Sequence, residues 1–545
     1  MRLYYLLLLI GLFNLQTFSQ PAKRDKAKLV VGVVVDQMRN DYVERFWNHY
    51  SDDGFKRLVN RGYRFKDTHF NYIPTKTAPG HASIYTGTSP MNHGIIANSW
   101  FDKTTGKSAY CAGDTSVASV GTSAKTGQMS PHRMLTTTIA DENRLATQMR
   151  GKTIGIAIKD RGAILPAGHT ASAAYWFHGQ DEGRWISSTF YMETLPQWVV
   201  DFNNSGKAAS YLKTWDTLYP IETYIESGSD LNNFEGGFKG KETATFPYDI
   251  HKLEADNRNF EILRSIAFGN DLTTDFAIAA IKGENLGQDY DTDFLTISYS
   301  STDYIGHNFG VNSKEVQDTY IRLDRNIADL LDFLDKEVGN DNYILFLTAD
   351  HAGVDVSSYL KSLNIPAGHF NTREMRSHVQ AFTEKEYGEK GLIENVSNDQ
   401  IFFDYKLMNQ LDIDPQELQD KVADLLIQYE HIHRVYTRNQ IIKGAYTEGA
   451  DALIKNGFHH KRSGDVLYIL EPSYVSSSRT TGSSHGSGYS YDTHVPLLFY
   501  GKGVKSGSTS RRSEIVDIAP TLATMLGISY PSATTGKPLN WMMKE

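Results

Sequence analysis

Short apolar runs alternate with stretches of helical periodicity towards both ends of the chain. Several runs have the length and composition of strands that are buried on both faces, namely Leu29–Val35, Lys152–Ile158, Asp293–Tyr299, Tyr343–Thr348 and Val495–Tyr500. Strands of this kind that alternate with helices are typical of a mostly parallel sheet covered by helices on each side. We therefore predict an α/β fold.

The helical patterns follow these strands. One helix is predicted around 41–60 and another from about 513 to 526. A third begins near Asn312, which forms an N-x-x-E capping pair with Glu315. Its apolar residues recur at spacings of three and four, at Val316, Tyr320, Leu323, Ile327, Leu330 and Leu334. This apolar face must pack on the sheet.

Two longer segments interrupt the α/β pattern. The first, about 177–268, is rich in Tyr, Asn, Gly and Trp and has little periodicity. The second, about 357–463, contains Asp414 and Pro415, an N-cap and a first-turn proline that open a helix through about Tyr429. We expect both segments to be insertions that form a cap on a single catalytic domain spanning 20–545.

The N-terminus has the pattern of a secretory signal peptide. Arg2 precedes the apolar run Leu3–Phe13, and Thr17 and Ser19 place small residues at a cleavage site. The run is shorter than the roughly 20 residues that span a bilayer. We expect residues 1–19 to be removed and the protein to be periplasmic or secreted, with no membrane span.

Composition narrows the chemistry that the chain can perform. Its 545 residues carry a formal charge of −9, and Cys111 is the only cysteine. Non-specific binding of nucleic acid needs clustered Lys and Arg that neutralise phosphates. Because the chain has a negative net charge, we expect no stable nucleic-acid partner. One cysteine forms no intrachain disulfide and builds no Cys-rich zinc module. Any metal site must therefore consist of carboxylates, imidazoles and hydroxyls.

Polar residues cluster where the predicted strands end. Asp36, Asp350 and His351 directly follow strands, and Asp303 and His307 lie in the predicted loop after another, 300–310. In open α/β sheets this edge is where ligands bind. Each residue alone would be explained by helix capping or turn formation. Together they supply carboxylate and imidazole ligands in two clusters, which predicts two metal ions.

A candidate nucleophile lies in the segment 74–81. Pro79 and Gly80 predict a tight turn, and a helix can begin immediately after it at Ala82. Such a junction points backbone N–H groups at an anion beside the Thr77 hydroxyl. A threonine hydroxyl needs a metal or a base to become a good nucleophile. Without the metal clusters, a simple capped turn would be the better interpretation.

Lys159 and Arg161 form a candidate anion site at the end of a predicted strand. They are two residues apart, so both side chains can leave the same face. Arginine offers a planar fork and lysine a point charge, which suits the oxygens of a phosphate group. Solvated strand ends often carry such pairs as well. Asn98 is a weaker candidate, because an asparagine there can simply close a turn.

The whole mature chain resembles the alkaline phosphatase superfamily, and within it the secreted single-chain phosphate-irrepressible alkaline phosphatases of the PafA type. The resemblance runs from Val34–Arg39 to Gly536–Leu539. Its most specific motifs are Thr77-Ala78-Pro79-Gly80-His81, Asp303-Tyr304-Ile305-Gly306-His307, Thr348-Ala349-Asp350-His351-Ala352-Gly353 and Ser484-His485-Gly486-Ser487. This resemblance implies a three-layer α/β/α sandwich with a mostly parallel central sheet and inserted cap segments.

The resemblance also implies a ligand set for two Zn²⁺ ions per chain. One zinc would be held by Asp303, His307 and His485. The other would be held by Asp36, Asp350 and His351, together with the Thr77 oxygen. The phosphate oxygens would be bound by Asn98, Lys159, Arg161 and the Ala78 N–H. His485 lies in a Ser/Gly-rich loop and is a candidate through the resemblance alone.

The implied activity is hydrolysis of phosphate monoesters through a phosphothreonine at Thr77, with release of inorganic phosphate. The sulfatase branch is disfavoured because the turn at Thr77 lacks the arginine of the C/S-x-P-x-R motif. A zinc phosphodiesterase or nucleotide pyrophosphatase remains an alternative, although Lys159 and Arg161 suit a monoester dianion better. An inactive secreted binding protein with the same fold is a further alternative. We expect a monomer that acts on small phosphate monoesters.

Overall fold

A computed structural model describes residues 26–180, 182–477 and 480–544, so the predicted signal peptide lies outside the described residues. Its central feature is an 11-stranded sheet in the order β20-β2-β19-β12-β1-β11-β6-β7-β8-β5, with β21 paired to β2. β1 is parallel to both of its neighbours, and β6 is parallel to β11 and β7. The predicted α/β class with a mostly parallel sheet is confirmed.

The predicted strands form the middle of this sheet. Three have the predicted bounds, namely β1 (Leu29–Val35), β11 (Asp293–Tyr299) and β12 (Tyr343–Thr348). β6 (Thr153–Ala157) and β19 (His494–Gly501) differ by a single residue at each end. The remaining strands of the sheet are β2 (Tyr63–His69), β5 (Ser119–Val120), β7 (Ala173–His178), β8 (Arg184–Ser188), β20 (Gly507–Thr509) and β21 (Ser513–Glu514).

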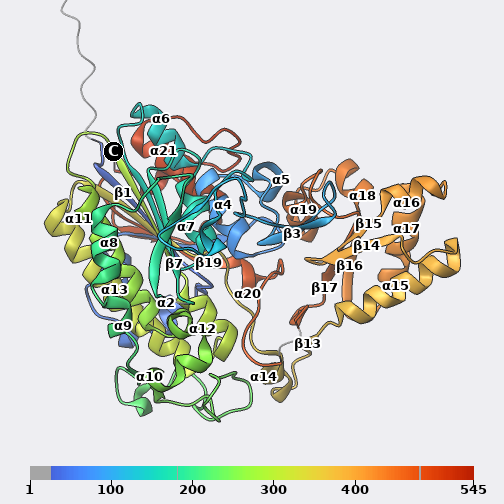
Figure 1. The fold of residues 1–545 in the computed structure, drawn as a ribbon, viewed down its shortest axis with the longest axis horizontal. Helices are drawn as coiled ribbons and strands as arrows, with labels where there is room; N and C mark the ends of the chain where they lie inside the picture. Colours follow the sequence, from blue (N-terminus) through green and yellow to red (C-terminus); the bar gives the residue numbers. More distant parts are fainter. Residues whose placement is uncertain (1–25, 181, 478–479, 545) are drawn as a thin grey trace, which may run out of the picture.

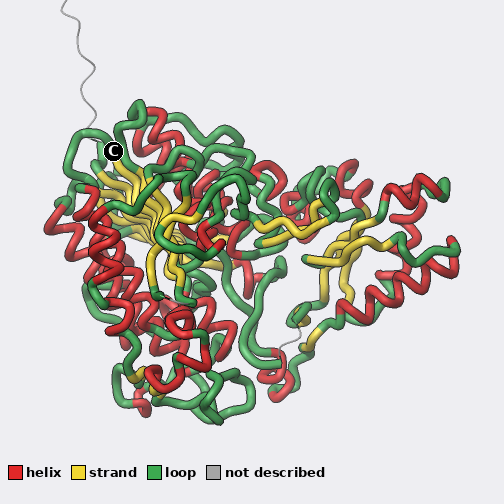
Figure 2. The backbone as a smooth tube through the Cα atoms, viewed as in Figure 1, coloured by secondary structure: helices red, strands yellow, loops and turns green. Residues whose placement is uncertain are grey.

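Helices cover both faces of the sheet, which makes three layers (Figure 1; Figure 2). One layer contains α4 (Thr77–Thr86), α6 (Ile139–Ala146), α7 (Asp160–Ala167) and α21 (Ile518–Leu526). The other contains α3 (Phe55–Arg61), α8 (Gln197–Asn204), α11 (Phe268–Glu284) and α13 (Lys314–Glu337). A Cβ at Gly32 would lie 2.2 Å from the Tyr85 hydroxyl oxygen. Glycine therefore interrupts the valine run of β1 because α4 packs directly across it.

Helix positions differ from the predictions in several places. The predicted 41–60 helix is broken into α2 (Tyr42–Arg45), a 3₁₀ turn and α3. The predicted capping pair of α13 is wrong by one residue, because Ser313 is the N-cap and its side chain accepts from the Val316 N–H. Asn312 instead donates to Asp355. The predicted 513–526 helix starts only at Ile518, after the short strand β21.

The first predicted insertion lies beside the C-terminal edge of the sheet. It contributes β8 to the main sheet and then forms α9 (Lys207–Ser210), α10 (Ile250–Leu253) and a two-stranded ribbon of β9 (Thr214–Trp215) and β10 (Tyr248–Asp249). Trp215 and Tyr248 pack against Phe309 with ring centroids 6.2 and 5.8 Å away. The segment has little regular periodicity, and these aromatic contacts pack it against the end of helix Ser301–Phe309.

The second predicted insertion contains most of a lobe with its own sheet and core, although one strand of that sheet, Val466–Leu470, lies beyond the predicted end at about 463. We call residues 371–470 the outer lobe; it projects away from the main sheet (Figure 1). Its four strands have the order β14-β15-β17-β16 and are β14 (Ile393–Ser397), β15 (Gln400–Phe403), β16 (Ile432–Thr437) and β17 (Val466–Leu470). Its helices are α15 (Thr372–Tyr387), α16 (Tyr405–Gln410), α17 (Pro415–Leu426), α18 (Arg438–Lys443) and α19 (Gly449–Gly457). Asp414 caps α17 as predicted, although the helix ends before Tyr429.

Shorter elements connect these layers. They are α5 (Pro90–His93), α12 (Ser301–Phe309), α14 (Ser357–Ser362), α20 (Ser490–Thr493), β3 (Ser99–Asp102), β4 (Lys107–Tyr110), β13 (Gly368–His369) and β18 (Tyr474–Val475). Among the helices of the described ranges, none has the length and apolar character needed to cross a membrane.

Candidate functional site

Four neighbouring parallel strands carry polar residues to one edge of the sheet. These strands lie in the order β12, β1, β11 and β6. Asp36 follows β1, Asp350 follows β12 after one residue, and Lys159 follows β6 after one residue. Asp303 follows β11 at the start of α12. The carboxyl ends of parallel strands meet at one edge, so residues far apart in the sequence converge there.

Asp303 and His307 lie on a helix, so the predicted 300–310 loop is wrong. Their spacing of four residues places them on the same face of α12, where the His307 Nε2 lies 3.2 Å from the Asp303 Oδ1. Gly306 allows this helix to approach β1, because a Cβ there would lie 1.9 Å from the Gln37 Oε1. Gly306 is thus a packing position inside the helix, and Gly310 follows its end.

The ligand atoms of the predicted clusters come together in the structure. Asp36, Asp350 and His351 each offer an atom within 4.8 Å of the others, and so do Asp303, His351 and His485. His351 therefore lies between the two groups, and its ring stacks on that of His485 at a centroid distance of 3.5 Å. His307 joins the second group through its contact with Asp303.

The three histidines are oriented by backbone carbonyl groups. His307, His351 and His485 donate their Nδ1 protons to the carbonyl oxygens of Ser483, Ala352 and Thr75, at 2.9, 2.9 and 2.7 Å. Each ring therefore turns its Nε2 towards a carboxylate, that of Asp303 for His307 and His485 and that of Asp36 for His351. Ligating histidines in metalloproteins are held in this way, with the second ring nitrogen donating to a fixed acceptor.

Buried acceptors without hydrogen bonds support a metal at this centre. The Asp36 Oδ1, the Asp350 Oδ2 and the His351 Nε2 are buried and make no hydrogen bond within the described ranges. Burial without a partner is costly for such groups, and native structures rarely contain them without a reason. A cation held between them would satisfy all three atoms, so the donor set fits metals that prefer imidazole and carboxylate ligands.

Lys159 forms an ion pair with one carboxylate of each group. Its Nζ lies 2.6 Å from the Asp36 Oδ2 and 2.5 Å from the Asp303 Oδ2, and it lies 4.9 Å from the centre of the Tyr304 ring. Burial alone would lower the pKa of Lys159, but the carboxylates of Asp303 and Asp36 raise it instead. The lysine thus stays charged and balances part of the negative charge of this centre.

The surroundings shift the pKa values of the three carboxyl groups in different directions. Burial, together with the nearby Asp350, raises the pKa of Asp36 well above its ordinary value. The pKa of Asp303 is held well below its ordinary value despite burial, because His307 and Lys159 favour its charged form. The pKa of Asp350 is also lowered against burial, by His351 and His81.

Thr77 is the first residue of α4, so the predicted turn before a helix at Ala82 is wrong. Pro79 and Gly80 lie inside the first turn, where proline loses no helical hydrogen bond. A Cβ at Gly80 would lie 2.1 Å from the Asp350 carbonyl oxygen. The first turn of the helix therefore packs directly against the metal-binding candidate Asp350, and Thr77 at its start is buried.

Lys159 and Arg161 do not leave one strand face as the sequence indicated. The helix that carries them, α7, packs against α4, which begins with Thr77. Lys159 is the N-cap of α7 and Arg161 lies in its first turn. Arg161 contacts the Tyr110 hydroxyl at 3.2 Å, while its Nε has no hydrogen bond in the described structure. The Ala78 N–H donates to the Asn98 Oδ1 at 2.8 Å, which leaves the Asn98 amide nitrogen for an anion.

Sequence reasoning gave no role to Gln37, which supports this centre together with His81. The Gln37 N–H donates to the Asp350 Oδ1 at 3.2 Å and its Nε2 donates to the Asp303 Oδ1 at 2.7 Å. Its φ of 65° is in the left-handed region, which turns the chain sharply after Asp36. His81 contacts Asp350 at 3.3 Å. The position of Gln37 directly after Asp36 was the only signal for it in the sequence.

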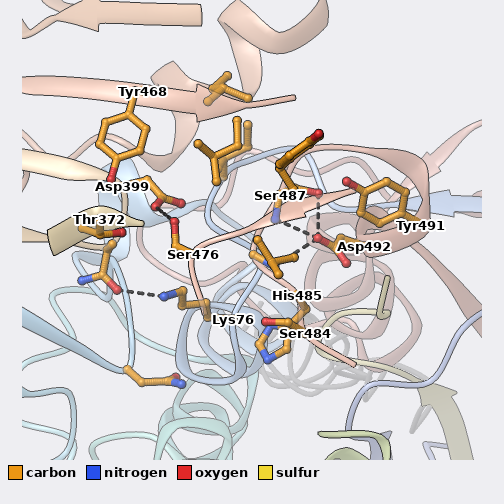
Figure 3. Close-up of a pocket in the computed structure, with 18 of the residues that line it drawn as sticks. Lys76, Thr372, Asp399, Tyr468, Ser476, Ser484, His485, Ser487, Tyr491 and Asp492 are labelled. Atoms are coloured by element: carbon orange, nitrogen blue, oxygen red, sulfur yellow. Dashed lines mark hydrogen bonds between the residues drawn. The ribbon is translucent and has the colours of Figure 1, made fainter. Parts of the chain in front are cut away.

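A cavity of about 370 Å³ opens onto the histidines from the side of the outer lobe (Figure 3). The residues that line it from outside the outer lobe include His307, His485, Lys76 and Asn98. The opposite side includes Asp399, Tyr468, Tyr474 and Ser476. Figure 3 shows the His485 ring at the base of this space, with Tyr491 and Asp492 on one side. A substrate that reaches the metal centre here would contact both parts of the molecule.

Comparisons with known proteins agree with this arrangement. The model of the type I phosphodiesterase / nucleotide pyrophosphatase family matches residues 30–494. A protein of Myroides odoratus named calcium-transporting ATPase is 44% identical over 527 residues, which are 96% of each chain. Alkaline phosphatase PafA of Elizabethkingia meningoseptica is 42% identical over 517 residues, 94% of each chain. A crystal structure of alkaline phosphatase PafA superposes with a TM-score of 0.92 at 41% identity and covers 95% of this chain and 99% of that one.

Proposed function

The chain belongs to the type I phosphodiesterase and nucleotide pyrophosphatase family of the alkaline phosphatase superfamily, and on that premise we propose that it is an alkaline phosphatase. It hydrolyses phosphate monoesters through a phosphothreonine at Thr77 and releases inorganic phosphate. The supporting observation is the position of Thr77, buried at the start of α4. The Gly80 of that helix lies against Asp350, and the helix packs on α7, which is capped by Lys159.

The metal ions of this proposal are two Zn²⁺ per chain. Asp36, Asp350, His351 and the Thr77 oxygen would hold one ion, and Asp303, His307 and His485 the other. His351 lies near both groups, so its assignment to the first rests on its contacts with Asp36 and Asp350, at 3.4 and 3.7 Å. When bound, the ions would lower the pKa of the Thr77 hydroxyl and stabilise the charge on the leaving oxygen.

The chain's own residues perform the transfer in two steps. The Thr77 Oγ1 attacks phosphorus, the bond from phosphorus to the leaving oxygen breaks, and an alcohol departs after gaining a proton. Water then hydrolyses the phosphothreonine, which releases inorganic phosphate and restores the hydroxyl of Thr77. The transition state for phosphoryl transfer is loose, so positioning and charge supply most of the catalysis. The Asn98 amide nitrogen and the Arg161 guanidinium would hold the non-bridging oxygens.

A phosphodiesterase is the second candidate function, because the family model is named for that activity. A diester carries one anionic charge fewer than a monoester dianion, so Lys159 and Arg161 favour the monoester. The name of the Myroides relative refers to ATP, whose terminal phosphoryl group is transferred by the same kind of chemistry. ATP therefore belongs among the substrates that we would assay.

The same proposal includes the setting in which the enzyme works. We propose that the chain is exported by its N-terminal signal peptide and acts as a monomer outside the cytoplasm on small phosphate monoesters. The order of Arg2 followed by the apolar run Leu3–Phe13 supports export. Mass spectrometry of the mature N-terminus and light scattering of the purified protein test these two points.

Paired substrates test the proposed activity. Release of one phenol from its phosphate monoester and from the matching methyl diester would be measured on the parent and on Thr77→Ala. We expect the parent to favour the monoester and the variant to lose both reactions. A parent enzyme that favours the diester would establish the phosphodiesterase alternative, and one that hydrolyses neither would support an inactive binding protein.

A further inference from the structure

A tight hairpin of the outer lobe contacts the part of the chain that carries Thr77 and Asn98. β14 and β15 are antiparallel, and Ser397 pairs with Gln400. Asn398 and Asp399 are thus a two-residue loop, and their φ values of 53° and 57° both lie in the left-handed region. A positive φ at both central residues is what a type I′ turn requires, and this is the loop that best matches the twist of two paired strands. The tip of the hairpin is therefore a defined structure.

The side-chain amide of Asn398 joins two segments of the catalytic domain. Its Oδ1 accepts a hydrogen bond from the Lys76 Nζ at 2.9 Å, and its Nδ2 donates to the Ser99 carbonyl oxygen at 2.8 Å. Lys76 immediately precedes the nucleophile candidate Thr77, and Ser99 immediately follows Asn98. One residue of the outer lobe thus contacts the neighbours of two site residues.

A third hydrogen bond closes the arrangement. The Ala78 N–H donates to the Asn98 Oδ1 at 2.8 Å, so the two catalytic-domain segments are also joined directly. Asn398, the segment 76–78 and the segment 98–99 therefore form a closed ring of contacts. Within such a ring the Thr77 backbone cannot move relative to Asn98 without breaking a hydrogen bond.

The surroundings of Lys76 hold it in this ring. Burial lowers the pKa of Lys76, and the neighbouring Asp399 carboxylate acts against that fall. Asp399 accepts from the Ser476 hydroxyl at 2.7 Å, and both Lys76 and Asp399 line the cavity (Figure 3). The Lys76 stem passes 3.6 Å from where a Cβ of Gly486 would lie. The lysine is therefore placed beside the loop that carries His485.

Further contacts fix the outer lobe against the catalytic domain. The Phe101 ring in β3 packs edge-on against Phe402 in β15, with centroids 5.3 Å apart. Lys103 forms an ion pair with Asp465 at 3.1 Å. Arg462 donates to the carbonyl oxygen of Arg133 at 2.8 Å. Because these contacts lie away from the hairpin tip, loss of the Asn398 amide alone would leave the lobe in place.

We propose that Asn398 is a positioning residue for phosphoryl transfer, which holds Thr77 and Asn98 in the relative placement that the reaction needs. This inference rests on the proposed phosphomonoesterase function. Displacement of a reacting group by about 1 Å can cost on the order of 100-fold in rate, so a contact that touches neither substrate nor metal can still control activity. Through Asn398, the outer lobe thus contacts the segments on which Thr77 and Asn98 lie.

Asn398→Gly is the sharpest test, because glycine adopts positive φ without strain and preserves the turn. Asn364→Gly is the matched control, since Asn364 has a φ of 60° and is exposed away from the site. We expect Asn398→Gly to lower kcat/KM for a phosphate monoester about 10- to 100-fold, with bound metal and Tm unchanged. The control should keep the parent rate.

A conservative variant and a double-mutant cycle separate positioning from a structural role. Asn398→Asp keeps the acceptor for Lys76 and should lose less activity than Asn398→Gly. In an Asn98→Ala background, the Asn398→Gly change should cost clearly less than it does alone, because Asn98 is one of its targets. A fully additive loss would overturn the proposal, as would parent activity in Asn398→Gly. A parent that hydrolyses no monoester would instead overturn the proposed function and the positioning role with it.

Discussion

His485 donates its Nδ1 proton to the carbonyl oxygen of Thr75 at 2.7 Å. Thr75 in turn donates its hydroxyl proton to the Ser487 carbonyl oxygen at 2.9 Å. The segment before Thr77 and the loop around His485 thus orient one another, although they are 410 residues apart. The nucleophile candidate and a metal-ligand candidate share one support, so a change in either segment will affect both.

Substitution of Thr77 tests the nucleophile. Thr77→Ser keeps a hydroxyl at the start of α4 and should retain activity. Thr77→Ala removes the attacking oxygen and should lower kcat for a phosphate monoester by more than about a thousandfold. Steady-state kinetics with metal content measured on each variant decide this. An alanine variant that turns over at the parent rate would show that another group attacks phosphorus.

Arg161 and Lys159 test the preference for monoesters. Arg161 has an unpaired Nε, so Arg161→Leu should remove one charge-assisted contact and reduce monoester kcat/KM about 10- to 100-fold. Diester hydrolysis should fall less. Lys159→Ala combined with Arg161→Leu should widen the difference. Equal losses on a monoester and a diester with the same leaving group would contradict the proposed discrimination.

Gly80 tests the packing of the nucleophile helix. In Gly80→Ala the added Cβ would meet the Asp350 carbonyl oxygen, so α4 must shift away from the metal centre. We expect a destabilisation of about 1–3 kcal/mol from overpacking and a larger loss of activity. Gly228→Ala is the control, because the nearest atom to its added Cβ lies 3.5 Å away. Urea unfolding and kinetics on both variants would show this, and an active Gly80→Ala would refute the contact.

Removal of metal should weaken the fold as well as abolish activity. Without cations, Asp36, Asp303 and Asp350 leave buried negative charge that only Lys159 and the histidines offset. Metal binding at 100 to 1,000 times Kd would stabilise the native state by about 3–4 kcal/mol. Calorimetry should therefore show a lower Tm after chelation and recovery on addition of zinc. An unchanged Tm would argue against a metal between these carboxylates.

Asp293 gives a pH effect that is independent of the metal centre. Burial raises the pKa of Asp293 to about 6, although the N–H groups of Gly287 and Lys152 donate to its carboxylate. Between about pH 4 and pH 6, the folded state therefore keeps a proton on Asp293 that the unfolded state has released. This contribution to stability is complete below about pH 4 and is lost as the pH rises through 6, with a limit of about 3 kcal/mol.

Asp293→Asn should remove this pH dependence. The free energy of unfolding of the variant, measured in urea from pH 4 to 7.5, should fall less steeply with pH than that of the parent. The variant also loses one backbone hydrogen bond, so its absolute stability carries a constant offset. Parallel curves for the two proteins would contradict a raised pKa at this position.

The sequence was sufficient to predict the residues that stand at strand ends. Asp36 and Asp350 follow apolar runs whose length and burial were readable, and parallel pairing brings their ends together. Lys159 was placed at the correct edge, but its ion pairs were not predicted. Its contacts with Asp36 and Asp303 depend on the order of the strands β1, β11 and β6, which local patterns do not contain.

Other features of the site depend on tertiary contacts. The segment of Asp303 and His307 contains glycines that favour a loop, yet packing against Gln37 allows a helix. His485 lies in a Ser/Gly loop without periodicity, so only the family resemblance pointed to it. Asn398 was not predicted at all, because an Asn-Asp pair indicates a turn but not the contacts of its side chains.

The central claim is that two bound metal ions and Thr77 make this chain a phosphate monoesterase. The most direct measurement is zinc content against hydrolysis rate on a single purified sample, with a monoester and a diester that share one leaving group. We predict that monoester hydrolysis rises with bound zinc, saturates at two ions per chain, and exceeds diester hydrolysis throughout. Full activity in a metal-free sample, or a faster reaction with the diester, would contradict the account.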